Sequence, residues 1–214
     1  MLKTVSVLFL SKLKVRLGEF DASGFRSPEE QNITEVFVAQ IIKHPQFSPR
    51  RLSFDAAVLI LDEEVRLKSP FHKLPGLPIN TACLPLCDSQ FSHVFSNGSG
   101  ATCWLSGWRV DRDSHVFQPL MTRDMVTLLP DTSCDQDIRT RVGESFSLNE
   151  SELCALRTRG DTCAGHVDGG AGLVCQSEQG RWTLAGILTW SLDTCHAPLV
   201  FLDVANIMEW IQSI

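Results

Sequence analysis

The chain of 214 residues lacks the features that define several classes of protein. It has no apolar run of membrane-spanning length, no internal repeat or low-complexity tract, and no long block of like charge. A membrane-spanning helix is therefore excluded. The 19 basic and 25 acidic residues give a net charge of -6, which disfavours a nucleic-acid partner and favours a protein. An apolar content of 43% excludes a disordered chain and can build one domain of two halves, or two small domains.

Paired CxxC motifs are also missing, although the chain has eight cysteines. Zinc sites use such closely spaced pairs, so the wide spacing of these cysteines favours disulfides. Three N-x-[ST] sequons, at Asn32, Asn97 and Asn149, are candidate glycosylation sites and fit the same oxidising compartment. We therefore expect an extracellular, secreted protein.

A convincing signal peptide is absent from the first residues. In "MLKTVSVLFLSKLK" the apolar run is short, Lys12 and Lys14 follow it directly, and no small-x-small cleavage motif appears. The alternation of Val5, Val7 and Phe9 favours a strand, with the true start of the protein missing.

Short apolar runs of period two dominate the remaining sequence and predict an all-β fold. We expect strands at 15–20, 34–44, 56–62, 102–108, 121–130, 171–175, 182–190 and 199–204. Helical spacing begins after Asp203, a candidate N-cap, and a weaker helical turn follows Pro130. The turn-rich stretch from Leu84 to Gly100 divides two strand-rich halves, at 1–95 and 96–214.

Several motifs stand in the order and spacing of one known family. They are "HPQF", "SFDAAVLILDEEV", "ACLP", "CWLSGW", "DTCAG", "DGGAGLVC", "LTWSLDTC" and the final "VANIMEWI". From Val15 to Ile214 the chain resembles a trypsin-like serine protease. "VRLGEFD" and "IRTRVGESFSLNESELCA" are similar to the clip-domain branch, which includes members that have lost catalysis. The resemblance implies two six-stranded antiparallel β-barrels and a C-terminal α-helix, here with an incomplete first barrel that lacks its first strands.

The family hydrolyses peptide bonds with a serine nucleophile, a histidine base and a buried aspartate that orients the histidine. The resemblance puts the aspartate position at Asp55, although an ordinary residue at a solvated strand start fits the same local pattern. None of the six histidines matches the histidine position, and His44 and His115 are expected on the surface. The family's Asp-Ser-Gly-Gly-Pro becomes "DGGAG" here, so Gly169 occupies the serine position and supplies no hydroxyl.

The substrate-pocket positions also depart from the family pattern. Asp161 matches the base of a pocket for Lys or Arg, but a carboxylate hydrogen-bonded locally near Cys163 explains it equally well. Trp190 and Ser191 stand at wall positions in "TWSL", where Ser191 replaces a glycine. Leu199 stands at another pocket-wall glycine, and we expect its side chain to fill the pocket.

The loop before Gly169 is longer than the family pattern by His166 and Val167, which we expect to distort the oxyanion hole. His166, Asp161 and Asp168 could together hold a metal, but irregular loop spacing is weak support for such a site. We expect no metal and no cofactor.

The resemblance also predicts three disulfides: Cys103 with Cys175, Cys134 with Cys154, and Cys163 with Cys195. Because all three lie in the second half, we expect that half to be the more stable one. Cys83 and Cys87 are left over. They could bond each other, pair with another chain or stay free.

The function that these observations favour is a secreted, catalytically inactive serine protease homologue that binds a protease, a zymogen or another extracellular protein as cofactor, decoy or regulator. By analogy with the family, this would be in a proteolytic cascade such as clotting, melanisation or innate immunity. One alternative is an active trypsin-like endopeptidase. A second alternative is a truncated product without folded function.

Overall fold

A computed structural model of the chain describes residues 12–24, 33–67, 79–85, 103–111, 114–158, 166–167, 169–176, 180–192 and 196–214. Several residues named above lie outside these ranges: Asn32, Asn97, Asp161, Cys163, Asp168 and Cys195, together with Cys87 and most of the expected linker.

The chain divides into two compact units. The first comprises Met1–Pro45 and Ala56–Thr81, and the second comprises Gln46–Asp55 and Ala82–Ile214. The segment Gln46–Asp55 therefore groups with the second unit although it lies within the N-terminal half of the sequence. The boundary expected at residue 95 stays a prediction.

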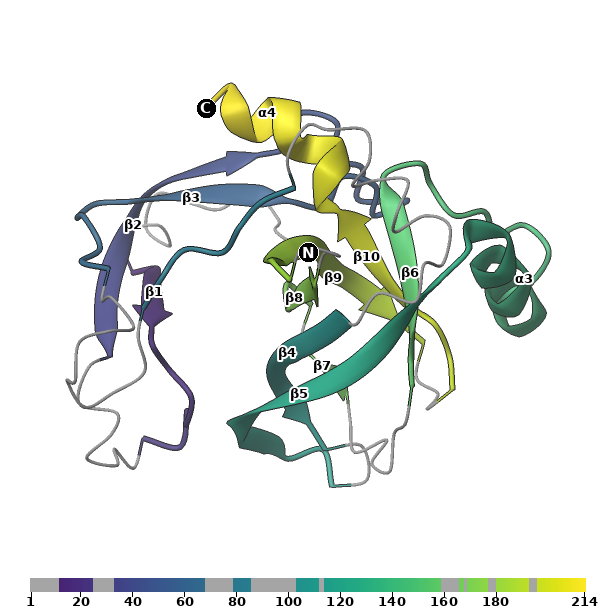
Figure 1. Ribbon diagram of the computed structural model, residues 1–214, viewed down its shortest axis with the longest axis horizontal. Helices are drawn as coiled ribbons and strands as arrows, with labels where there is room; N and C mark the ends of the chain where they lie inside the picture. Colours follow the sequence, from purple (N-terminus) through teal and green to yellow (C-terminus); the bar gives the residue numbers. More distant parts are fainter. Residues whose placement is uncertain are drawn as a thin grey trace. The chain divides into compact units, whose positions relative to one another are not determined.

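The first unit contains a three-stranded antiparallel sheet in the order β1-β2-β3 (Figure 1). Its strands are β1 (Lys14–Leu17), β2 (Thr34–Lys43) and β3 (Ala57–Leu61). Val36 and Val38 are buried while their neighbours along β2 are exposed or half-buried, as period-two alternation requires. Across the β1–β2 pair, Glu35 accepts from Arg16 at 2.7 Å.

The second unit is built on a closed barrel (Figure 1). Its six strands are β4 (Cys103–Val110), β5 (Phe117–Leu129), β6 (Glu152–Arg157), β8 (Gly172–Gln176), β9 (Trp182–Ser191) and β10 (Leu199–Asp203). They follow one another as β5-β6-β10-β9-β8-β4, and β4 pairs again with β5. The short β7 (His166–Val167) pairs with β4. Leu105, Leu173 and Phe201 fill the barrel core and are at most 1% exposed. This barrel confirms the predicted fold class.

Among the described residues, two helical segments accompany the barrel. The weak helical signal after Pro130 corresponds to a full helix, α3 (Asp131–Val142), which buries Cys134 and Ile138. The C-terminal helix is also confirmed, with a 3-10 turn, η2 (Val204–Ile207), before α4 (Met208–Gln212). Asp203 is the N-cap of η2, and its carboxylate accepts a hydrogen bond from the backbone N–H of Ala205 at 2.9 Å.

Three features differ from the sequence-based expectations. His166 and Val167 were expected in a loop but form the short strand β7, because their backbone pairs with Val110 and Arg109 of β4. Strand β6 was not predicted, because its burial pattern does not alternate and its first residue, Glu152, is acidic. His44 was expected on the surface but is only 5% exposed at the end of β2, where burial lowers its pKa. His115 is exposed, as expected.

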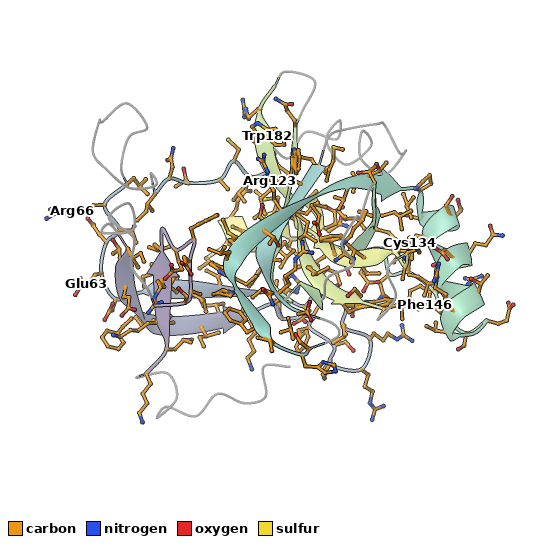
Figure 2. The ribbon with its side chains drawn as sticks, turned by 90° about the horizontal axis from the view of Figure 1, so that it is seen from below. Glu63, Arg66, Arg123, Cys134, Phe146 and Trp182 are labelled. Carbon is orange, nitrogen blue, oxygen red and sulfur yellow. A yellow bond between two sulfur atoms is a disulfide. The ribbon has the colours of Figure 1, made fainter. Side chains whose placement is uncertain are left out.

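Two predicted disulfides are confirmed. Cys103 and Cys175 are directly opposite each other on β4 and β8, and their bond closes a loop with a sequence separation of 72. Cys134 on α3 bonds Cys154 on β6 with a separation of 20 (Figure 2). In the chain-entropy model the two bonds contribute about 4 and about 3 kcal/mol. Cys83 is an exposed free thiol.

None of the helices in the described residues is long and apolar enough to cross a bilayer.

Candidate functional site

The glycine-rich turn after β7 is fastened to the neighbouring strand β9. The backbone N–H of Gly170 donates to the carbonyl of Leu188 at 2.7 Å, and the N–H of Leu188 donates to the carbonyl of Ala171 at 2.9 Å. Gly170 has a φ of 96°, a left-handed conformation that favours glycine. Gly169 is exposed at the head of this turn.

Space does not require a glycine at Gly169. A Cβ atom built there would lie 3.7 Å from the carbonyl oxygen of Thr189 and 3.8 Å from that of Leu188, which are ordinary contacts. Its φ lies outside the left-handed region that disfavours a side chain. The lack of a hydroxyl at this turn is therefore a property of the sequence and not a demand of the packing.

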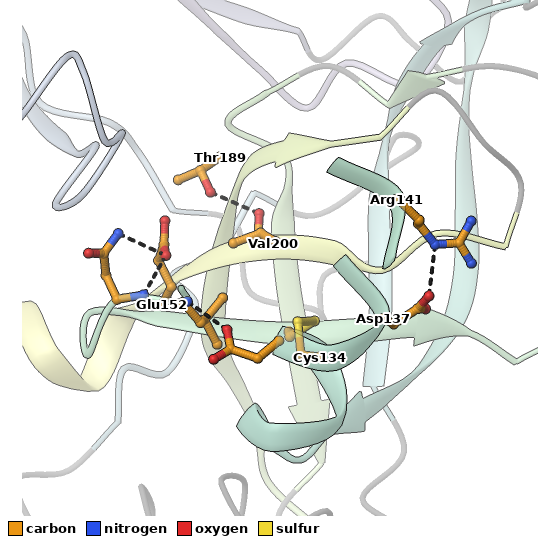
Figure 3. The surroundings of a disulfide bond; sticks show 10 residues. Cys134, Asp137, Arg141, Glu152, Thr189 and Val200 are labelled. Carbon is orange, nitrogen blue, oxygen red and sulfur yellow. Dashed lines mark hydrogen bonds and ion pairs between the residues drawn. A yellow bond between two sulfur atoms is a disulfide. The ribbon is translucent and has the colours of Figure 1, made fainter. Parts of the chain in front are cut away.

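Strands β9 and β10 bring the other predicted pocket residues together. Leu199 lies directly opposite Ser191, and Val200 lies opposite Trp190. The hydroxyl of Thr189 donates to the carbonyl of Val200 at 2.8 Å and ties the two strands (Figure 3). The side chain of Leu199 is 1% exposed and belongs to the barrel core. Position 199 is therefore occupied by a fully buried apolar side chain.

Asp55 ends the segment Gln46–Asp55, which groups with the same unit as Gly169. It is half-buried and lies two residues before β3. Within the three residues before it, Leu52 and Phe54 have φ values of 55° and 52°, a backbone conformation that is strained for non-glycine residues. The segment holds itself together through a bridge between Ser48 and Ser53.

A cavity of about 500 Å³ lies against this loop and was not predicted from the sequence. Its lining includes Arg50, Arg51, Leu52, Phe146, Glu152 and Trp190, all from the second unit. The rings of Phe146 and Trp190 meet edge to face, with centroids 5.6 Å apart. Figure 2 shows Phe146 beside α3.

Among the described residues that line this cavity, Glu152 is the one with an acidic side chain, and it is 6% exposed. Its Oε2 accepts from the backbone N–H of Asn149 at 2.9 Å and from Asn149 Nδ2 at 3.1 Å (Figure 3). Its Oε1 is buried, and no donor among the described residues meets full hydrogen-bond geometry with it, although the Trp190 indole is close by. Burial raises the pKa of Glu152, and the Asn149 hydrogen bonds and the nearby Trp190 indole offset this only in part. Sequence reasoning missed this residue because nothing local marks it as buried.

The remaining candidate residues are only partly described. The sequon residue Asn149 is half-buried, and Ser151 of the same sequon is 2% exposed. Glycosylation of all three sequons stays a prediction. Within the described ranges no three His, Cys, Asp or Glu side chains gather as metal ligands, and the side chain of His166 lies outside those ranges.

A closed six-stranded barrel with a disulfide between facing strands and a glycine turn against β9 agrees with the fold expected of a trypsin-like serine-protease domain. The chain belongs to the trypsin family, because the family model described as Trypsin matches residues 5–211. This confirms the resemblance seen in the motifs.

Three of the similar curated proteins come from insects. The chain is 34% identical over 207 residues to "Inactive CLIP domain-containing serine protease A3" of Aedes aegypti, covering 94% of this chain and 40% of the relative. It is 30% identical to "Phenoloxidase-activating factor 2" of Galleria mellonella, covering 94% of this chain and 63% of the relative. It is also 30% identical to "Inactive CLIP domain-containing serine protease A28" of Anopheles gambiae, covering 94% and 49%. The chain thus spans about half the length of these relatives.

Proposed function

We propose that the chain is a secreted, non-catalytic homologue of trypsin-like proteases that acts by binding another protein. The observation that carries this proposal is Gly169, which stands where the family motif has its serine. A glycine cannot form the acyl-enzyme bond that the family's reaction needs. A Cβ atom at Gly169 would make only ordinary contacts, so the packing has room for a serine side chain at this position.

The buried Leu199 supports the same proposal from the side of substrate recognition. Its position opposite Ser191 matches the two pocket-wall positions of the family motif, both usually glycine. Leu199 is 1% exposed, and we propose that its side chain takes the space that an arginine or lysine side chain of a substrate would need. Asp55 and Asp161 are then proposed to mark the former triad and pocket positions without serving catalysis.

The names of the relatives support the finer proposal. Two of them are called inactive CLIP domain-containing serine proteases, and a third is called a phenoloxidase-activating factor. We propose an accessory role of this kind, as cofactor, decoy or regulator in an extracellular proteolytic cascade. The two disulfides fit the oxidising environment that this role requires.

An active-site probe tests the absence of catalysis. Purified chain is incubated with a biotinylated fluorophosphonate, and hydrolysis of an arginine-aminocoumarin peptide is followed in parallel, with trypsin as the positive control. We expect neither labelling nor hydrolysis. Stoichiometric labelling, or hydrolysis that scales with the concentration of the chain, would overturn the proposal and favour an active endopeptidase.

A further inference from the structure

Strand β3 lies at one edge of the three-stranded sheet of the first unit. Among the described residues it pairs with β2 on one side and with no strand on the other. The carbonyl of Ala56, just before β3, accepts from the backbone N–H of His44 at 3.0 Å. Because backbone groups alternate in direction along an antiparallel strand, those of Ala57, Leu59 and Leu61 point away from β2. They form a row of donors and acceptors that no described residue fills.

This edge lacks the features that usually protect an edge strand from further pairing, which are a proline, a charged side chain or a β-bulge. The run "AAVLIL", at 56–61, has neither a proline nor a charge. The extra residue of the β2–β3 pair, between Val38 and Gln40, belongs to β2. Leu59 and Ile60 follow each other and so point to opposite faces, and they are 39% and 38% exposed. The open edge of β3 therefore has apolar surface on both faces.

The other open edges of the described strands are protected. Strand β1, at the opposite edge of the same sheet, carries Lys14 and Arg16, which both form ion pairs with Glu35. The first part of β5, at 117–124, has no described strand on its outer side, but it contains Pro119 and an irregular register. The edge of β3 is thus the one best suited to accept another strand.

The end of this edge is acidic. Asp62, Glu63 and Glu64 follow β3 directly and are exposed, and Figure 2 shows Glu63 among them. None of the three carboxylates forms an ion pair with another described residue, and Arg66 is the one base that follows closely. A strand antiparallel to β3 begins beside this end, so basic residues at its start would meet the carboxylates. A second copy of the chain fits less well, because it brings the same acidic end and a net charge of -6.

We propose that the open edge of β3 receives an extended segment of the protein partner, which adds a fourth strand to the sheet. The inference rests on the proposed function and names the chemistry that the partner presents: Lys or Arg residues followed by a run of β-branched residues. Backbone hydrogen bonds to Ala57, Leu59 and Leu61 supply affinity, and the acidic end of β3 selects the basic start of the segment.

Three blocked octapeptides test the proposal on the whole chain. The first has two lysines followed by alternating threonine and valine, the second begins with two glutamates instead, and the third repeats the first with N-methyl groups on its two central residues. Dissociation constants are measured by NMR titration of the isotope-labelled chain.

We expect the lysine peptide to bind about tenfold more tightly than the glutamate peptide, because the charges at the acidic end change from attractive to repulsive. It should also bind about tenfold more tightly than the N-methylated peptide, which has lost one backbone donor on each edge. Equal affinities in either comparison, or no binding of the lysine peptide, would overturn the proposal.

Amide exchange followed by NMR locates the bound peptide. In the free chain the amides of Leu59 and Leu61 should exchange faster than those of Val58 and Ile60, which point to β2. The lysine peptide should slow exchange at Leu59 and Leu61 about tenfold. Slow exchange at both residues before the peptide is added would show that the edge is already covered, by the chain itself or by a second copy. That result, or protection by the peptide only at other strands, would overturn the proposal.

A pair of double variants tests the acidic end. Glu63→Gln combined with Glu64→Gln should reduce the preference for the lysine peptide over the glutamate peptide about threefold. The control, Glu144→Gln combined with Glu150→Gln, makes the same change of charge at exposed residues of the second unit and should leave the preference unchanged. An unchanged preference in the first variant, or an equal reduction in both, would contradict a role for the acidic end and overturn the proposal.

These outcomes are separable from those of the proposed function. The binding measurement involves no hydrolysis, so a chain that binds none of the peptides can still be non-catalytic. Conversely, labelling by the fluorophosphonate would overturn the proposed function whatever the peptides do.

Discussion

Of the two neighbouring glycines in the turn after β7, the backbone conformation favours glycine only at Gly170. Gly170 has a backbone conformation that other residues adopt at a cost, whereas Gly169 has ordinary space for a side chain. A change at Gly169 therefore tests chemistry, and a change at Gly170 tests backbone strain.

Gly169→Ser should fold normally, with a free energy of unfolding within about 0.5 kcal/mol of the parent chain. It should not gain hydrolysis of arginine substrates, because Leu199 still fills the proposed pocket position. Thermal unfolding and the aminocoumarin assay check the two expectations. As the matched control, Gly170→Ser should destabilise the fold by about 1 kcal/mol or more. Arginine-specific hydrolysis by Gly169→Ser would contradict the role proposed for Leu199.

At the scale of elements, charged side chains tie strands and helices of the second unit together. On the barrel, Asp124 of β5 accepts from Arg109 of β4 at 2.8 Å and from Arg157 of β6 at 3.1 Å. The Arg109 side chain is 6% exposed, so its charge depends on this partner. On α3, by contrast, Asp137 and Arg141 form a pair that is about one-third exposed (Figure 3).

Asp124→Asn should destabilise the barrel by about 3 kcal/mol, since it leaves buried guanidinium charge without a carboxylate. The control Asp137→Asn removes a partly exposed pair within one helix and should cost less than about 1 kcal/mol. Urea unfolding of the two variants measures both values. Equal costs would contradict a structural role for the β4–β5–β6 network.

The cap of the C-terminal helix should make stability depend on pH. Burial raises the pKa of Asp203 to about 6, from 3.8, with a smaller contribution from the charge of Asp131 and an opposing one from the Ala205 hydrogen bond. Between these two values the unfolded carboxyl is ionised while the folded one keeps its proton. The folded state then binds more protons, so stability is lost as pH rises through this window.

Asp203→Asn should remove this dependence, because an asparagine still caps the helix but does not titrate. Relative to the variant, the parent chain should lose on the order of 2 to 3 kcal/mol of unfolding free energy as the pH rises from about 4 to about 7. Urea unfolding at a series of pH values measures this difference. Parallel pH profiles for the two proteins would show that Asp203 does not titrate in this range.

At the scale of the whole molecule, the two units differ in whether their described strands close into a barrel. The second unit has a closed barrel and both described disulfides, whereas the described part of the first unit contains three strands. The free energy of local unfolding is lowest in segments that few buried contacts and cross-links hold in place.

Amide hydrogens of β1–β3 should therefore exchange faster than those of β8–β10. Hydrogen exchange with mass spectrometry measures this, and reduction of the disulfides should narrow the difference by destabilising the second unit. Equal protection in the two units before reduction would contradict the expected order of stability.

The alternation of apolar residues predicted the all-β class, and helical spacing predicted the C-terminal helix. The motifs indicated the family, and this resemblance in turn implied the pairings Cys103–Cys175 and Cys134–Cys154. The lack of a hydroxyl at Gly169 is likewise visible in the sequence, because it concerns a single side chain within a recognisable motif. These features depend on residues close in sequence or on a pattern shared by the family.

Only the tertiary structure decided which residues meet across the chain. It grouped Gln46–Asp55 with the second unit, set Leu199 opposite Ser191, and buried Glu152 beside Trp190. No local pattern marks an acidic residue as buried, because burial depends on strands that pack against it from elsewhere in the sequence. The same reason hid the cavity, whose walls come from segments about a hundred residues apart.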